Sequence, residues 1–223
     1  MLKRAECLAR QGRWREAAHD AKIAVESVPS EHYYYHTLAP LLVACEDWNA
    51  YSSLSQTIVA HFGDTTNVNV ADRMAKDCLI AAVPGLDLEA VGGLASLAVT
   101  KGTNDMSLPF FQACEAMAEY REGNYQDATV WAKKSLENAF PYSRAEAFSV
   151  LAMAYNRLDE SDAARNALTS GRAVLFHEMP QLEGGDLGIN WRDWIIAHAL
   201  LTEAQNLLSA SSTKPNSANP IDK

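Results

Sequence analysis

Long hydrophobic runs are missing from this sequence of 223 residues. No stretch of roughly 18 apolar residues occurs, so no segment is expected to insert into a membrane. The first residues, MLKRAECLARQGRWREAA, are charged throughout and lack the apolar centre of a signal peptide, which predicts a cytoplasmic protein. A surplus of positive charge is missing too, because the formal net charge is -9. Nucleic-acid binding is therefore not expected, since it requires concentrated Lys and Arg.

Glycine and proline are few, with 11 and 8 residues spaced at intervals. Alanine is frequent among the hydrophobic residues, which make up 48% of the chain, and this composition predicts an all-α protein. The cysteines are few as well, and they are Cys7, Cys45, Cys78 and Cys114. They form no C-x-x-C motif and fall in alanine-rich helical patterns, so we expect buried free thiols rather than disulfides.

Motifs for metal binding and catalysis are also missing. His32 and His36 would share one helix face, but Tyr33 stands where the zinc motif H-E-x-x-H has its glutamate. The Gly-rich segment at 183–188 lacks the Lys-Ser/Thr of a phosphate loop and is interpreted as a flexible connection. We see no Ser-His-Asp or Cys-His arrangement, so no enzymatic activity, cofactor or metal ion is predicted.

The sequence does contain an internal repeat. Residues 10–29 reappear in outline at 121–141, each copy having a tight turn, an aromatic residue and a helix with regularly spaced small residues. Weaker copies lie at 45–63, 84–102 and 158–171. The predicted turn positions are Gly12, Glu46, Gly85, Gly123 and Asp159. Their spacings of 34, 39, 38 and 36 residues are close to the period of about 34 of a tetratricopeptide repeat.

The chain resembles the tetratricopeptide family at specific positions. In the first unit, the family's turn glycine, aromatic, two small residues and terminal proline fall on Gly12, Trp14, Ala17, Ala24 and Pro29. The fourth unit follows the same pattern with Gly123, Tyr125, Ala128, Ala132 and Ser135. The resemblance implies a right-handed superhelix of about five antiparallel helix hairpins.

The repeat array is predicted to span residues 1–210. Its hairpin units are expected at about 1–29, 32–63, 68–102, 107–141 and 144–177. A capping helix at 189–210 would bury Trp191, Trp194, Ile195, His198, Leu201 and Leu208 against the preceding repeat. The same helix would leave Arg192, Asp193, Glu203 and Asn206 to solvent. The polar segment 211–223 is expected to be a disordered tail.

A narrower resemblance concerns the combination of HYYYHTLAPLL with a terminal DWIIAHALL. This order of segments is similar to the C-terminal helical regions of large serine/threonine protein kinases of planctomycete and verrucomicrobial bacteria. It implies an interaction or regulatory region of a longer protein, and Met1 falling inside the first repeat helix agrees with that expectation. The kinase motifs H-R-D and D-F-G are not in the sequence, so this segment should not phosphorylate anything.

The concave surface of the array is the predicted binding site, because related proteins bind peptides or helices there through first-helix side chains. On the repeat alignment Tyr35 takes a core position, whereas Tyr33 and His36 point to the concave surface. The same alignment places Phe110, Ala113, Met117, Tyr120 and Arg121 there from the fourth unit. The fifth unit contributes Ser149, Met153, Asn156 and Arg157. Aromatic residues, Met and Arg anchor many interfaces, although the competing interpretation is that these side chains only pack.

The leading hypothesis is a non-catalytic scaffold that binds a peptide or protein segment in this concave groove. A structural or dimerising module without a peptide ligand is one alternative, and a small-molecule sensor is another. A clamp for a C-terminal carboxylate would need Lys, Arg and Asn on successive first helices. The equivalent positions hold His36, Ala75, Ala113 and Ser149, so such a clamp is not predicted.

Overall fold

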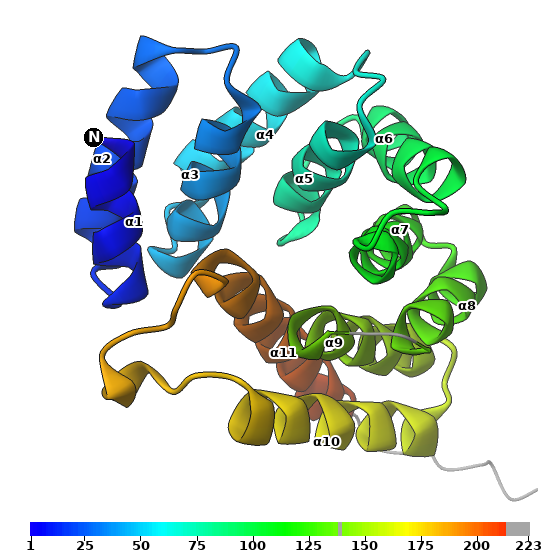
Figure 1. Ribbon diagram of the computed structural model, residues 1–223. Helices are drawn as coiled ribbons and strands as arrows, with labels where there is room; N and C mark the ends of the chain where they lie inside the picture. The colour runs from blue at the N-terminus through cyan, green and yellow to red at the C-terminus, as the bar shows by residue number, and fades with distance from the viewer. Residues whose placement is uncertain (138–139, 213–223) are drawn as a thin grey trace, which may run out of the picture.

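The computed structural model describes residues 1–137 and 140–212, and in these ranges it contains helices and no strand. The all-α prediction is therefore confirmed for the described residues (Figure 1). The α-helices are α1 Leu2–Arg10, α2 Trp14–Ser27, α3 His32–Ala44, α4 Trp48–Phe62, α5 Val68–Leu79, α6 Leu88–Lys101, α7 Leu108–Glu122, α8 Tyr125–Leu136, α9 Pro141–Arg157, α10 Ser161–Glu178 and α11 Trp191–Ser212. A short 3-10 helix, η1, covers Leu182–Gly184.

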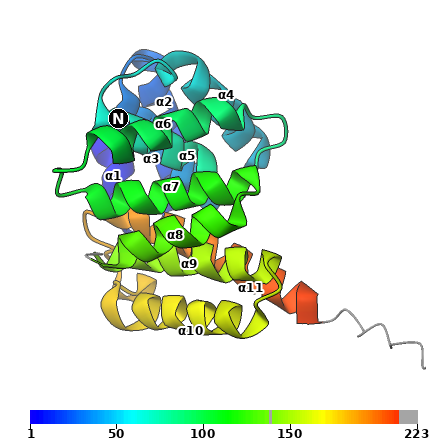
Figure 2. The same cartoon turned by 90° about the vertical axis from the view of Figure 1, so that its right-hand side faces the viewer.

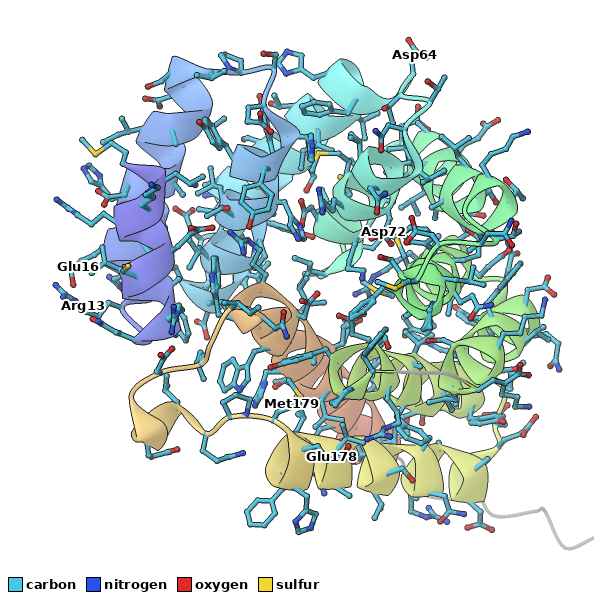
Figure 3. The ribbon with its side chains drawn as sticks, in the orientation of Figure 1. Arg13, Glu16, Asp64, Asp72, Glu178 and Met179 are labelled. Atoms are coloured by element: carbon cyan, nitrogen blue, oxygen red, sulfur yellow. The ribbon has the colours of Figure 1, made fainter. Side chains whose placement is uncertain are left out.

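Alternate helices form an inner and an outer layer. Helices α3, α5, α7 and α9 contact one another in order, while α4, α6 and α8 each contact the two inner helices on either side. Figure 2 shows α6 to α10 stacked in chain order. Contacts between sequential neighbours are typical of a helical solenoid, and side chains of the inner layer fill the interior (Figure 3).

The predicted turn positions share one backbone conformation. Gly12, Glu46, Gly85, Gly123 and Asp159 all have left-handed φ angles, between 57° and 91°. A side chain with a Cβ is strained in this conformation, which explains the glycine at three of the five positions. The repeated turns that we predicted from sequence spacing are therefore confirmed as a structural feature.

Small residues let the hairpin helices approach closely, as the repeat pattern predicts. Ala17 and Ala24 on α2, and Ala128 and Ala132 on α8, are buried against neighbouring helices. Ser135 is buried as well, and its hydroxyl donates a hydrogen bond to the carbonyl of Pro109 on α7 at 2.7 Å. A larger side chain at these positions would separate the helices.

Helix α11 lies across the inner layer, in contact with α3, α9 and α10. Several predicted packing residues are buried, namely Trp191, Ile195, Leu201 and Leu208. The expectation that Arg192 faces solvent is wrong. Its side chain is buried, and Nη2 donates hydrogen bonds to Glu6 at 2.6 Å and to Thr37 at 2.9 Å, which offset part of the cost of burying the charge.

Two of the four cysteines are buried free thiols, as predicted. Cys78 and Cys114 lie in the inner layer on α5 and α7. The prediction is wrong for Cys7, whose side chain is exposed on α1. Cys45 is partly buried at the end of α3.

The end of α11 meets the predicted tail. Ser211 and Ser212 belong to the helix, and the rest of the predicted tail, 213–223, lies outside the described residues. Among the residues that are described, no helix is both long and apolar enough to cross a membrane.

Candidate functional site

Several of the predicted groove residues lie inside the helix packing. The four that have at most 1% of their surface exposed are Ala113, Met117, Ser149 and Met153. Ser149 also turns its hydroxyl to the carbonyl of Ala145 on its own helix, at 2.8 Å. These four side chains offer no surface to a partner in this structure.

Tyr33 and His36 are engaged with neighbouring side chains. The Tyr33 hydroxyl donates a hydrogen bond to Glu6 at 3.3 Å, and the Arg192 guanidinium lies 4.5 Å from the centre of its ring. His36 Nδ1 lies 2.9 Å from the buried carboxylate of Asp77. No group of three or more His, Cys, Asp or Glu side chains in residues 1–137 and 140–212 could hold a metal ion.

The other aromatic and polar groove residues are nearer to the surface. Phe110 stacks on Phe140 with ring centres 5.6 Å apart. Tyr120 is buried, and a hydrogen bond to its hydroxyl raises the pKa of Arg157, whose side chain is exposed. Asn156 is half-buried at the end of α9.

Arg121 holds three helices together. Its guanidinium donates to both carboxylate oxygens of Glu203 on α11, at 2.5 and 2.7 Å. It also donates to the carbonyls of Leu79 and Ile80 at the end of α5, at 3.1 to 3.2 Å. The Glu203 carboxylate outweighs the cost of burial and raises the pKa of Arg121. Glu203, expected in solvent, is therefore partly buried and paired with Arg121.

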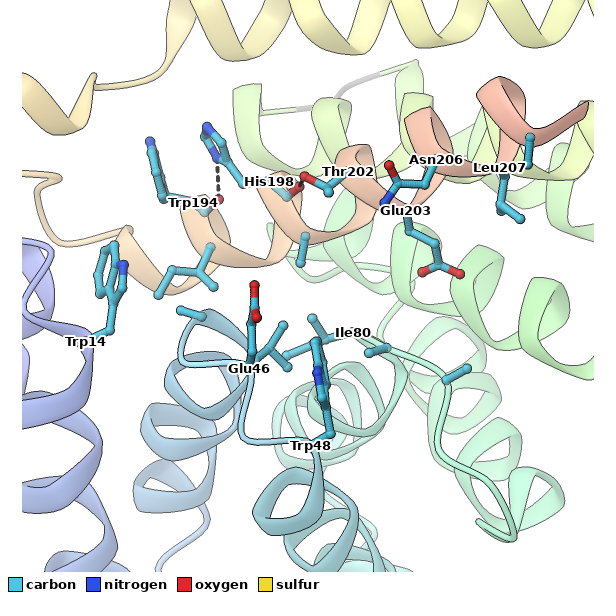
Figure 4. Close-up of a pocket in the computed structure, with 17 residues that line it drawn as sticks. Trp14, Glu46, Trp48, Ile80, Trp194, His198, Thr202, Glu203, Asn206 and Leu207 are labelled. Carbon is cyan, nitrogen blue, oxygen red and sulfur yellow. Dashed lines mark hydrogen bonds between the residues drawn. The ribbon is translucent and has the colours of Figure 1, made fainter. Parts of the chain in front are cut away.

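A cleft of about 750 Å³ opens between α11 and the turns that join the inner and outer helices. Figure 4 shows α11 on one side of this cleft and the ends of α3 and α5 on the other. Its apolar lining comes mainly from Trp14, Val43, Trp48, Ile80, Trp194, Ile195, Ala199 and Leu207. We call this site the tryptophan cleft.

One wall of the tryptophan cleft is a fixed aromatic stack. The rings of Trp14 and Trp194 are 6.2 Å apart, and Trp194 stacks on His198 at 3.6 Å. Trp194 Nε1 donates a hydrogen bond to the carbonyl of Pro180 at 2.7 Å, and His198 Nδ1 donates to the Trp194 carbonyl at 2.8 Å. Burial lowers the pKa of His198, so its imidazole is neutral at pH 7. These contacts fix the rings in place before any ligand binds.

The opposite wall is more exposed. Trp48 is the first residue of α4, and its side chain is 51% exposed although it is one of the largest apolar groups in the chain. Its indole points toward α11, with Glu46 beside it (Figure 4). A large aromatic ring in a cleft buries much apolar surface when a partner covers it, which makes Trp48 the natural anchor of this site.

The tryptophan cleft could not be found from the sequence. Trp14 was interpreted as a repeat position, which stays a prediction, and Trp194 as a packing residue, and both side chains do pack against the core. The available signal was that Trp14 and Trp48 each come two residues after a predicted turn position. Which helix faces those turns depends on the path of α11, and repeat spacing does not encode that path.

Comparison with known proteins was made at the level of families and of individual curated proteins. A scan against protein-family models finds no match, and a search of curated proteins finds none either. The resemblance to tetratricopeptide repeats and to kinase C-terminal regions therefore stays a prediction, and a function has to be argued from the geometry of the tryptophan cleft.

Proposed function

We propose that this chain is a non-catalytic helical-repeat scaffold that binds a segment of another protein in the tryptophan cleft. The observation that carries this proposal is the half-exposed indole of Trp48 in a mostly apolar cleft of about 750 Å³. Protein interfaces are typically anchored by a few aromatic side chains in such hollows, surrounded by contacts that contribute less.

The proposed class of function is the one predicted from the sequence, but the proposed binding site differs from the predicted concave groove. The predicted concave groove is crossed by α11, which contacts α3 and α9. The side of α11 that faces away from these contacts forms the tryptophan cleft together with the hairpin turns. We retain as parts of the proposal the right-handed superhelix of five hairpins and the origin in a larger bacterial serine/threonine kinase.

A small-molecule sensor is the second candidate, and one observation favours it. Ligand pockets commonly enclose about 300 to 1,000 Å³, and the tryptophan cleft falls within this range. A dimerising module is the third, in which a second copy of the chain covers Trp48. Light scattering separates this last case, because a stable dimer doubles the molar mass.

A display library of random peptides tests the scaffold proposal. Peptides that bind the wild-type chain should be lost with Trp48→Ser, because the anchor of the cleft is removed. Phe176→Ser is the matched control, since Phe176 is a 71% exposed aromatic on α10 that does not line the tryptophan cleft. Peptides lost equally with both variants, or with neither, would contradict a binding site at Trp48.

A further inference from the structure

The tryptophan cleft carries one unpaired negative charge. Glu46 is exposed at the turn after α3, and Figure 4 shows its carboxylate directed toward α11. Among the described residues no cationic side chain forms an ion pair with it, since Arg13 beside the cleft is paired with Glu16. Arg15 lines two adjoining hollows that Glu46 also lines, but the two side chains form no ion pair.

The second carboxylate of the cleft is paired with an arginine of the chain. Glu203 gives both oxygens to Arg121, so its charge is balanced within the chain. The lining residues of the cleft include no Lys and no Arg. Glu46 therefore sets the sign of the charge that a ligand meets when it enters.

Three tryptophans line the same cleft as this carboxylate. Trp14 and Trp194 stand on one side of Glu46 and Trp48 on the other (Figure 4). Indole is the most favourable aromatic partner for a cation, because the face of the ring is electron-rich. A carboxylate near the exposed indole of Trp48 thus favours a cationic group and disfavours an anionic one.

The remaining lining suits an apolar stem. Ile80, Ile195 and Leu207 add apolar surface to the cleft, and Leu207 lies farther along α11 than Trp194 (Figure 4). Lys and Arg side chains combine a charged head with an aliphatic stem that packs on apolar surface. A peptide that presents one of these side chains among apolar neighbours matches both parts of the cleft.

We infer that the tryptophan cleft selects an apolar peptide segment carrying a Lys or Arg, whose cationic head binds Glu46 between the indole rings. This inference rests on the proposed function and names the chemistry of the partner. The overall charge of -9 favours the approach of such a segment.

Three synthetic peptides test this inference. They share one Leu- and Ala-rich helical sequence and differ only at a central position, which is Arg, norleucine or Glu. Fluorescence anisotropy should show the Arg peptide binding about fivefold to tenfold more tightly than the norleucine peptide. The Glu peptide should bind more weakly than both, because its carboxylate meets Glu46.

Glu46→Gln should reduce the preference for the Arg peptide to less than about twofold and leave the norleucine peptide unchanged. Asp159→Asn is the matched control, because Asp159 is the other acidic residue with a left-handed turn conformation and lies outside the cleft. This control should retain the full preference for Arg.

Equal binding of the Arg and norleucine peptides to the wild-type chain would overturn the cation site and leave the scaffold proposal standing. A preference for Arg that survives Glu46→Gln would also overturn it, since the cation would then bind elsewhere. No binding of any of the three peptides would overturn both the inference and the proposed function.

Discussion

Lys76 Nζ lies 3.5 Å from Glu146 Oε2 in the interior of the array, where both side chains are almost wholly buried. This contact joins α5 to α9, and the carboxylates of Asp72 and Asp193 lie close enough to influence it. Burial, with the neighbouring carboxylates, raises the pKa of Glu146 to about 8. Burial alone would lower the pKa of Lys76, but Asp72 and Glu146 raise it overall. Both pKa shifts therefore favour the protonated forms of the two side chains.

The ionisation of Glu146 should make the stability of the folded chain depend on pH. Its pKa in the folded state, about 8, is above the ordinary value of 4.5. Between these values the folded chain holds a proton that the unfolded chain has lost, so Glu146 makes stability fall as pH rises. Glu146→Gln should flatten the free energy of unfolding over this range in urea titrations.

Glu160→Gln is the control for the pH experiment, because Glu160 is exposed at the start of α10. This variant should keep the slope of the wild-type chain. A Glu146→Gln variant with an unchanged slope would show that Glu146 is ionised in the folded state.

Arg121 should matter for stability rather than for partner binding. Arg121→Ala leaves the carbonyls of Leu79 and Ile80 and the Glu203 carboxylate without their donor. We expect a loss of about 2 to 4 kcal/mol in the free energy of unfolding, because these acceptors are largely shielded from water. Arg165→Ala removes an exposed ion pair on α10 and should cost less than about 0.5 kcal/mol. Equal unfolding midpoints for the two variants would contradict a stabilising role for Arg121.

The turn positions predict two substitutions with opposite effects. A Cβ at Gly123 would contact nothing within 4 Å, so Gly123→Ala should cost about 1 kcal/mol through its φ of 91° alone. Asp159→Gly at the equivalent turn, with φ of 61°, should stabilise the chain by up to about 1 kcal/mol. Thermal unfolding of both variants checks this pair, and shifts of the same sign would contradict a shared turn geometry.

The local parts of this fold could be predicted from the sequence. Ala17 and Ala128 each lie five residues after a turn, at Gly12 and Gly123. Because they are so close along the chain, residue spacing predicts which small residues face the neighbouring helix of the hairpin. The left-handed turn at Glu46 was also found, although no glycine marks it, because the period of the repeat places a turn there. Such features depend on neighbours that are close in sequence.

The tryptophan cleft could not be predicted, because the path of α11 is set by contacts between residues that are distant in sequence. Arg192 reaches Glu6 across 186 positions, and Arg121 reaches Glu203 across 82. Neither contact follows from the repeat, because α11 is not a repeat helix. Without the path of α11, a polar side chain such as Arg192 is assigned to solvent and the inner surface is interpreted as an open groove.

Fluorine NMR of the chain carrying fluorinated tryptophan tests the binding site most directly, because the five tryptophans divide into two groups. Trp14, Trp48 and Trp194 line the tryptophan cleft, whereas Trp131 and Trp191 do not. A peptide selected on the wild-type chain should shift the three cleft resonances and leave the other two in place. Unchanged resonances of all three cleft tryptophans at a saturating peptide concentration would contradict the tryptophan cleft as the site of partner binding.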